Sequence, residues 1–288
     1  MREALREHAA RRLAAPPRVR CPLDSLDYVF TAGGLAEGVS GFRAYRAGRL
    51  AGDQLVAVWD AHGILTGVVV GDELGARRTG ALGAVAADVL ARQDSRVAAI
   101  IGTGHQAWTQ LWALRAVRPL REIRVYSRDP RRRDAFAARA ATELSLPASS
   151  AACAADAVQG ADIVVLATNA KTPVLDAADI APGTHVTTVG PKTRDSHETP
   201  LELVGACGLI TCDSPEQARD YPGQFFTGSA TLVSLADVIA GRVPGRSHDD
   251  EITLHCSVGL AGTEVLLADH LLRAHASRAQ GLGEVVRR

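Results

Sequence analysis

The feature that most constrains the fold is a glycine turn between a short apolar run and a helical stretch. Val97–Ile101 is apolar, a helical pattern runs to about Ala116, and the turn between them reads Gly102-Thr103-Gly104-His105-Gln106-Ala107. In a G-x-G-x-x-G/A turn, the first Gly permits the tight turn, the second lets a pyrophosphate approach the backbone, and the small last residue keeps helix and strand close. The helix N-terminus adds unpaired N–H groups and partial positive charge. The turn therefore predicts a dinucleotide-binding βαβ unit, with a purely structural turn as the alternative.

Further apolar strands alternate with helical stretches through the middle of the chain. A helix is expected from about Pro130 to Glu143, and the expected strands are Ile123–Tyr126, Asp162–Ala167, His185–Val189 and Leu209–Cys212. Such alternation indicates βαβ units and a mainly parallel sheet. We therefore expect an α/β fold whose residues 96–257 form a Rossmann-type doubly wound parallel sheet.

The chain before residue 96 has a different pattern. Gly41–Tyr45, Leu55–Trp59 and Ile64–Val70 are β-rich runs separated by Gly and Asp turns, without helices between them. A long Ala-rich helix is expected over Gly75–Arg92, and the chain is helical again from about Gly259. This pattern predicts a smaller α+β domain made of residues 1–95 with 258–288. Residues 1–20 read as a surface helix ended by Pro16-Pro17 rather than as a targeting helix.

Composition excludes several classes of partner. The 288 residues include 32 basic and 32 acidic side chains, which gives no case for nucleic acid or an anionic membrane as partner. No apolar run approaches the ~18 residues of a membrane span. The five cysteines are odd in number and form no C-x-x-C pair, which argues against a disulfide framework, a structural zinc site and any other metal site. We expect a cytoplasmic protein.

The end of the second strand of a dinucleotide fold discriminates between the nicotinamide cofactors. An acidic residue there accepts from the ribose 2′-OH and selects NAD. This chain instead has Ser127-Arg128-Asp129, with Arg132 just beyond. Ser127 leaves room for a 2′-phosphate, and Arg128, with Arg132 as a second candidate, offers it a guanidinium. The sequence therefore favours NADP. NAD stays open, because a strand that ends two residues later puts Asp129 at the tip.

Lysine is almost absent, since Lys171 and Lys192 are the only two in the chain. Arginine serves as well in surface ion pairs, but it cannot deprotonate or form a Schiff base. Because lysine is absent elsewhere, we interpret these two positions as places where an amine is needed. The alternative is that the two lysines remain by chance. Both lysines follow expected strands, at the carboxyl ends where ligands bind in open α/β sheets.

From about Leu55 to Ala276 the chain resembles the ornithine cyclodeaminase/mu-crystallin family. The matching pieces stand in the family's order and at its usual spacing. They are Arg78-Thr79-Gly80-Ala81, Leu90-Ala91-Arg92-Gln93-Asp94-Ser95, the glycine turn ending in Gln106-Ala107, Gly160-Ala161-Asp162-Ile163-Val164, Pro182-Gly183-Thr184-His185-Val186, Asp213-Ser214-Pro215-Glu216-Gln217-Ala218, Ile252-Thr253-Leu254-His255 and Ser257-Val258-Gly259-Leu260-Ala261.

The resemblance implies a homodimer in which an N-terminal substrate-binding and dimerisation domain stands beside a Rossmann domain, with the active site in the cleft between them. It also implies a small α-amino or α-imino acid substrate and a nicotinamide cofactor. Some members recycle the cofactor to eject ammonia and cyclise the substrate, and others are net dehydrogenases or ketimine reductases.

Several positions carry roles over from the resemblance. Arg78 corresponds to the family's arginine that grips the substrate carboxylate, with an exposed helix-start arginine as the alternative. Arg43 stands where the family usually has a lysine that contacts substrate. Near the nicotinamide the resemblance places a set of cofactor-binding residues, namely Thr168, Asn169, Val189, Gly190, Ser257 and Gly259. Asp213 and Ser214 look like structural elements at the end of a strand.

The chain departs from the family after Val189-Gly190-Pro191. Cyclodeaminases and related alanine dehydrogenases resemble one another in an aspartate two residues beyond the Gly, whereas this chain has Lys192. A protonated lysine cannot accept a hydrogen bond as that carboxylate does. A lowered pKa would suit Lys192 for general acid–base work. Holding a second substrate carboxylate and a solvent-facing loop lysine are the alternatives. His197 is an alternate acid–base group, and Glu198 matches a family glutamate with a structural character.

The leading hypothesis is an NAD(P)-dependent oxidoreductase that interconverts a small α-amino acid and its imino or keto acid, with Arg78 and Lys192 as catalytic candidates. Arg43, Arg78 and Lys192 are the substrate-binding candidates. A cyclodeaminase-type ammonia-lyase with recycled NAD is the first alternative, and the missing aspartate counts against it. A non-catalytic dinucleotide or small-ligand binding protein is the second alternative.

Overall fold

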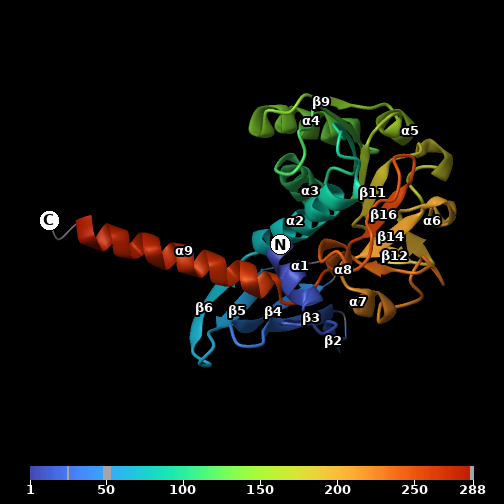
Figure 1. Ribbon diagram of the computed structural model, residues 1–288. Helices are drawn as coiled ribbons and strands as arrows, with labels where there is room; N and C mark the ends of the chain where they lie inside the picture. Colours follow the sequence, from blue (N-terminus) through green and yellow to red (C-terminus); the bar gives the residue numbers. More distant parts are fainter. Residues whose placement is uncertain (25, 48–52, 286–288) are drawn as a thin grey trace. The chain divides into compact units, whose positions relative to one another are not determined.

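The computed structural model describes residues 1–24, 26–47 and 53–285. The chain forms two compact units, one from Glu3–Arg78 with the chain from Leu260, and one from Thr79–Gly259 (Figure 1). The first division falls inside helix α2 (Glu73–Leu90). The expected domain boundaries lie at residues 95 and 257, so the later turns of α2 belong to the second unit instead of the first.

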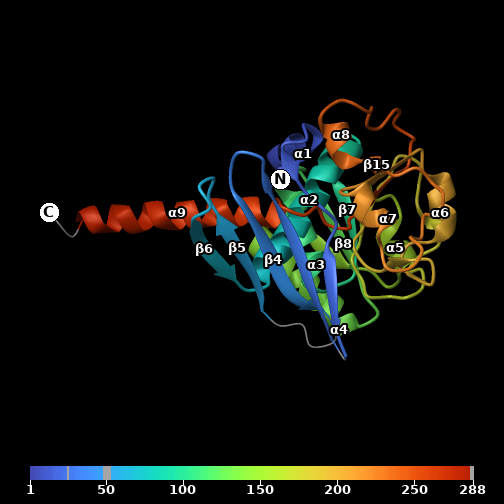
Figure 2. The ribbon, with the colours of Figure 1, turned by 90° about the horizontal axis from the view of Figure 1, so that it is seen from below.

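The first unit is built around an antiparallel sheet. Its elements are α1 (Arg2–Ala9), β1 (Leu13–Ala14), β2 (Val19–Leu23), β3 (Leu26–Leu35), β4 (Ser40–Ala47), β5 (Gln54–Trp59), β6 (Leu65–Val70) and α9 (Thr263–Val285). The strand order is β1-β3-β4-β5-β6, with β2 also paired to β3. Strands β3 to β6 follow one another across the sheet (Figure 2). The N-terminal helix is shorter than expected, because Arg11 takes the left-handed conformation at φ 58° and the chain then pairs as β1 and β2.

The two faces of this sheet differ because side chains alternate along each strand. On one face, Val56 and Val58 pack against Val265 and Ala268 of α9. On the opposite face, a row of paired positions crosses five strands, comprising Val19, Phe30, Ala44, Leu55 and Val70. Four of these five are exposed large apolar residues. The first unit therefore has one face packed by α9 and one apolar face open to solvent.

The second unit is an α/β fold. Its elements are β7 (Val97–Ile101), α3 (His105–Arg115), β8 (Glu122–Tyr126), α4 (Pro130–Leu144), β9 (Ala148–Ser150), α5 (Ala154–Val158), β10 (Ile163–Leu166), a 3-10 turn η1 (Ala177–Asp179), β11 (His185–Thr188), β12 (Lys192–Thr193), β13 (Ser196–His197), α6 (Leu201–Ala206), β14 (Leu209–Cys212), α7 (Pro215–Arg219), β15 (Val233–Ser234), α8 (Leu235–Ile239) and β16 (Thr253–Cys256).

Eight parallel strands form the central sheet of this unit in the order β15-β14-β16-β11-β10-β7-β8-β9 (Figure 1). Separate apolar cores lie on its two faces, with Ala99 and Ile101 in one and Ala98 and Ile100 in the other. Because both faces are covered, all of β7 is buried, which explains its continuous apolar sequence. The expected α/β fold with a parallel sheet and a separate antiparallel domain is confirmed.

Candidate functional site

The glycine turn joins β7 to α3 as the sequence predicts. Gly102 has φ +112°, a conformation that L side chains rarely adopt, and a Cβ there would also collide with the carbonyl oxygen of Ala167. Gly104 precedes the first residue of α3, and a Cβ built on it meets nothing within 4 Å. The turn is anchored by the Gly102 N–H, which donates to Tyr126 O at 2.8 Å. The open N-terminus of α3 at this turn has the geometry of an anion cradle.

The tip of β8 is formed by Ser127, because the strand ends at Tyr126. Asp129 is committed elsewhere, since its Oδ1 accepts from the backbone N–H groups of Arg131 at 3.0 Å and Arg132 at 3.4 Å and caps α4. The Arg128 side chain is exposed. Arg132 is exposed as well, so the small hydroxyl residue at the tip and the two exposed arginines leave space and positive charge for an anionic group.

The loops after β10 and β11 meet at one carboxylate, Glu198, which is fully buried. Its Oε2 accepts from the Thr168 N–H and hydroxyl, both at 2.7 Å. Its Oε1 accepts from the Thr188 hydroxyl at 2.8 Å, the Val189 N–H at 3.1 Å and the Gly190 N–H at 2.5 Å. Five donors, from the last residue of β11 and from the loops after β10 and β11, thus converge on this one side chain, which gives it a structural role broader than the sequence indicated.

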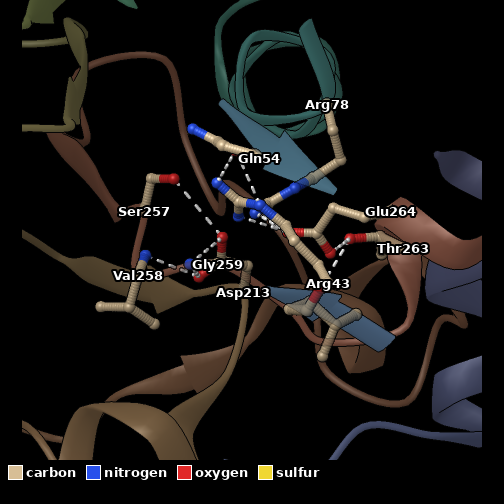
Figure 3. Close-up of polar contacts among 10 residues, drawn as sticks. Arg43, Gln54, Arg78, Asp213, Ser257, Val258, Gly259, Thr263 and Glu264 are labelled. Atoms are coloured by element: carbon tan, nitrogen blue, oxygen red, sulfur yellow. Dashed lines mark hydrogen bonds and ion pairs between the residues drawn. The ribbon is translucent and has the colours of Figure 1, made fainter. Parts of the chain in front are cut away.

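A second carboxylate, Asp213, holds the loop after β16. It accepts from the Val258 N–H at 2.8 Å and the Gly259 N–H at 3.0 Å, and the Ser257 hydroxyl lies 3.4 Å away (Figure 3). Asp213 is fully buried. These contacts give Asp213 the role of a structural acceptor at the end of β14.

The candidate cofactor residues therefore share one edge of the second unit. The glycine turn follows β7, Ser127 follows β8, Asn169 lies in the loop after β10, Gly190 follows β11 and Gly259 follows β16. In a parallel sheet the carboxyl ends of the strands lie at the same edge, where α/β proteins bind their ligands.

Lys192 does not face solvent. Its side chain is 1% exposed, and its Nζ donates to Gly190 O at 2.7 Å. Burial lowers the Lys192 pKa, while the negative charge of Glu198 opposes that shift. The alternative of a solvent-facing loop lysine is therefore wrong, and the catalytic and substrate-binding roles of Lys192 stay predictions.

The two candidate substrate arginines lie together in the first unit, around a buried glutamate that the sequence did not single out. Glu264 Oε1 accepts from Arg78 Nη2 and, at 2.9 Å, from Arg43 Nη1 (Figure 3). Burial alone would raise the Glu264 pKa, but the charges of Arg78 and Arg43 outweigh it and hold that pKa below its ordinary value. The cluster therefore holds two positive charges and one negative charge, a net charge of +1.

The two arginines differ in how many donors are already in use. Each of the three guanidinium nitrogens of Arg43 already makes a hydrogen bond, because its Nε and Nη2 donate to Gln54 Oε1 and its Nη1 donates to Glu264. Arg78 is 5% exposed, and its buried Nε and Nη1 have no hydrogen-bond partner among the described residues. Unpaired buried donors of a charged group are costly, and a carboxylate is the partner that a guanidinium fork fits best.

The sequence missed Glu264 and Gln54 as members of this cluster. Gln54 lies 11 residues from Arg43, but Glu264 lies 221 residues away, so no local spacing joins them. A glutamate in the first turn of a helix is ordinarily explained by its favourable interaction with the helix dipole. The sequence therefore offers no reason to expect that Glu264 also binds two arginines.

In the part of the chain that the structure describes, no helix combines the length and the apolar character needed to cross a membrane.

Comparisons with known proteins identify relatives along most of the chain. The model of the ornithine cyclodeaminase/mu-crystallin family matches residues 55–277. A Delta(1)-pyrroline-2-carboxylate reductase of Bacillus cereus is 34% identical over 215 residues, which cover 72% of this chain and 65% of that protein. The aligned stretches span less than two thirds of the first curated relatives' own lengths.

Two solved structures share the architecture. The Delta(1)-pyrroline-2-carboxylate reductase of Thermococcus litoralis, in complex with NADH and L-proline, is 27% identical with a TM-score of 0.86 over 96% of this chain and 92% of that one. An archaeal alanine dehydrogenase dimer with bound NAD is 27% identical with a TM-score of 0.85, over 96% of this chain and 90% of that one.

Proposed function

Because this chain belongs to the ornithine cyclodeaminase/mu-crystallin family, we propose that it is an NAD(P)-dependent oxidoreductase that interconverts a small α-amino acid and its imino or keto acid. Relatives named as pyrroline-2-carboxylate reductases, a ketimine reductase and an alanine dehydrogenase support this reaction class. The observation that carries the proposal is the buried Arg78, which lies beside Glu264 and whose Nε and Nη1 have no partner in the described part of the chain.

Arg78 binds the substrate carboxylate in this proposal. The cluster of Arg43, Arg78 and Glu264 has a net charge of +1, so one carboxylate neutralises it. Nε and Nη1 of Arg78 supply the unpartnered donors, while Glu264 holds Nη2. Arg43 would act mainly by fixing Glu264, because Gln54 and Glu264 already occupy its nitrogens.

The edge of the parallel sheet binds the cofactor, which supplies hydride chemistry at the substrate carbon when bound. The backbone of Thr103, Gly104 and His105 would cradle the pyrophosphate at the N-terminus of α3. Gln106 Oε1 is a buried acceptor without a partner among the described residues, and it is available to a donor of the ligand. These features fit a dinucleotide.

NADP is the preferred cofactor in this proposal. Ser127 at the strand tip presents no carboxylate to a 2′-phosphate, and the Asp129 carboxylate is occupied by the N-cap of α4. Arg128 and Arg132 are exposed next to the tip and offer guanidiniums to the phosphate. Relatives bind NADH or NAD, so this preference would distinguish the chain from them.

The reduction also needs a proton at the substrate nitrogen, and Lys192 is the candidate donor. Burial lowers its pKa from the ordinary lysine value, which makes its proton easier to give up. Its Nζ lies at the end of β11, bonded to Gly190 O. Holding Gly190 in place is the competing role for Lys192, and kinetics separate the two roles.

We propose a homodimer formed through the open apolar face of the first unit. On that face Val19 and Val70 are 63% and 65% exposed, and Phe30 and Leu55 lie between them in the same row. Apolar area of this kind on a sheet marks an interaction surface. A solved relative is a dimer. Val70→Asp would shift the protein toward monomer in light scattering coupled to size exclusion.

Free cysteines support a reducing compartment, and we place the protein in the cytoplasm. All five, at positions 21, 153, 207, 212 and 256, are unpaired. Two of them, Cys21 and Cys153, are exposed, where an oxidising environment would modify them.

Steady-state kinetics with NADPH test the proposal. Cyclic imino acids such as Δ1-pyrroline-2-carboxylate, and pyruvate with ammonia, are the substrates to screen. Arg78→Met should raise KM at least 100-fold or abolish turnover, whereas Arg77→Met, which changes the half-buried neighbour on the same helix, should leave the kinetics within twofold. Equal kinetics for the wild type and Arg78→Met would refute the role of Arg78.

A further inference from the structure

Glu198 occupies a place in the second unit that the proposed reaction does not yet explain. It lies beyond β13 (Ser196–His197), yet its carboxylate accepts four hydrogen bonds from the loops after β10 and β11 and a fifth from Thr188, the last residue of β11. Three of those donors are backbone N–H groups, of Thr168, Val189 and Gly190. Backbone donors fix the main chain itself, so Glu198 sets where these two loops run.

Sheet order shows which half of a dinucleotide these loops would meet. The pyrophosphate cradle follows β7, whose neighbours are β8 on one side and β10 on the other, with β11 beyond β10. The ribose that carries the 2′ group is read at the tip of β8, at Ser127. A dinucleotide that crosses this edge therefore lays its other half, the nicotinamide, over the ends of β10 and β11.

Little space is left around the peptide of Gly190. A Cβ there would collide with the Thr168 carbonyl oxygen and lie 2.5 Å from Glu198 Oε2. The Gly190 N–H donates to Glu198 Oε1, and the Gly190 carbonyl accepts from Lys192 Nζ at 2.7 Å. The backbone of Gly190 is thus held on both sides, its N–H by the buried Glu198 carboxylate and its carbonyl by the buried Lys192 amine.

The pyrophosphate cradle is held by other contacts. Gly102 N–H donates to Tyr126 O at 2.8 Å, and Ala167 N–H, one residue before the Glu198 contacts begin, donates to Ile101 O at 2.9 Å. Neither bond involves Glu198. A change at Glu198 should therefore displace the loops after β10 and β11 more than the cradle, although Thr168 lies beside Gly102.

From these contacts we infer that Glu198 is the positioning residue for the nicotinamide half of the cofactor, an inference that rests on the proposed use of a nicotinamide dinucleotide. It acts through Thr168, Val189 and Gly190 and does not touch the reacting atoms. Its negative charge is essential to this role. In Glu198→Gln, the side-chain NH2 would face at least two of the five donors and could accept from none of them.

Calorimetric titration of the full-length protein with two ligands tests the inference. The first is NADPH, and the second is 2′-phospho-ADP-ribose, which keeps the pyrophosphate and the 2′-phosphate but lacks the nicotinamide. Glu198→Gln should weaken NADPH binding about 10- to 100-fold and change the affinity of the fragment less than threefold. Glu202→Gln, on the exposed first turn of α6, is the matched control and should change neither.

A milder variant covers the case in which Glu198→Gln does not fold. Thr188→Val removes one hydroxyl donor to Oε1 and keeps the volume of the side chain. It should weaken NADPH binding several-fold, leave the fragment unaffected, and lower the rate of hydride transfer in a single turnover more than it raises the substrate KM. Equal losses for NADPH and the fragment, or no loss in either variant, would overturn the inference.

The wild type separates this inference from the proposed function. If the wild type binds neither NADPH nor NADH, the proposed function fails. If the wild type binds them and both variants bind NADPH as well as it does, only the role of Glu198 fails.

Discussion

Arg78 and Glu264, 186 residues apart in the chain, form a buried ion pair in which Arg78 Nη2 donates to Glu264 Oε1. The same oxygen accepts from Arg43. The start of α9 thereby holds the arginine of α2 in one orientation, and Nε and Nη1 of Arg78 have no hydrogen-bond partner among the described residues. In the proposed function, stability and substrate binding in the first unit would therefore depend on the same carboxylate.

Glu264→Gln should be strongly destabilising, because it leaves two buried guanidiniums without their counter-ion. The expected loss is about 3 kcal/mol in the free energy of unfolding, measured by urea denaturation. Glu73→Gln removes the partner of Arg77 at the surface and should cost less than about 0.5 kcal/mol. Equal stability of the two variants would show that the buried cluster contributes nothing beyond a surface pair.

The cofactor preference should reverse when the tip of β8 is changed. Ser127→Asp repels a 2′-phosphate and offers an acceptor to a ribose 2′-OH, so the ratio of kcat/KM for NADPH over NADH should fall at least tenfold. Arg128→Ala should lower the same ratio by loss of a charge-assisted contact. Arg121→Ala, exposed just before the start of β8, is the control. An unchanged ratio in both tip variants would contradict the predicted NADP preference.

Lys192→Met should distinguish a proton donor from a residue that only holds Gly190. If Lys192 is the proton donor, its replacement should lower kcat about 100-fold or more and change KM little. In the wild type, the reductive rate should fall as pH rises through the Lys192 pKa, which burial places below the ordinary lysine value. Lys171→Met changes the other, exposed lysine and should be silent. A normal kcat in Lys192→Met would leave Lys192 only its contact with Gly190 O.

Acid should destabilise the second unit through its buried histidines. Burial and the charge of Lys192 lower the His255 pKa to about 4, although Asp213 opposes the shift, and burial lowers the His185 pKa well below its usual value. In the unfolded chain these histidines become protonated near pH 6.5, whereas in the folded chain they stay neutral to a lower pH. The free energy of unfolding therefore falls as the pH drops from about 6.5 toward 4. His255 alone accounts for about 2 kcal/mol between pH 7.5 and pH 5.

Urea denaturation of His255→Gln at the two pH values checks this. The variant should lose about 2 kcal/mol less than the wild type between them, whatever its stability at pH 7.5. His248→Gln, at an exposed position, should keep the wild-type dependence. A pH dependence that survives intact in His255→Gln would place its source elsewhere.

Local patterns predicted the second unit well. Val97–Ile101 and Leu209–Cys212 match β7 and β14 residue for residue. The whole of β7 is buried, which explains why its sequence is apolar throughout. The glycine turn was equally readable, because φ +112° at Gly102 requires glycine. The N-terminal helix was overestimated, because the reversal at Arg11 comes from pairing of β1 with β3 and not from the prolines.

The long-range contacts that assemble the candidate site could not be predicted from the sequence. Glu264 and Arg78 become partners only because α9 packs on the sheet next to the first turns of α2. The sequence around neither residue predicts its contact with the other. Glu198 could be placed on a loop, but the convergence of Thr168 and Gly190 on it depends on the order of β10 and β11 in the sheet. Long-range order of this kind is set by packing and leaves no local pattern.

The most direct test of the proposed function is the stoichiometry of cofactor and product. Purified protein is given Δ1-pyrroline-2-carboxylate or pyruvate with ammonia in the presence of NADPH or NADH, and separately ornithine with NAD. The proposed oxidoreductase should oxidise one NAD(P)H for each amino acid formed from the imino or keto acid, and it should release no ammonia from ornithine. Proline and ammonia formed from ornithine without net NADH would contradict it and identify a cyclodeaminase instead.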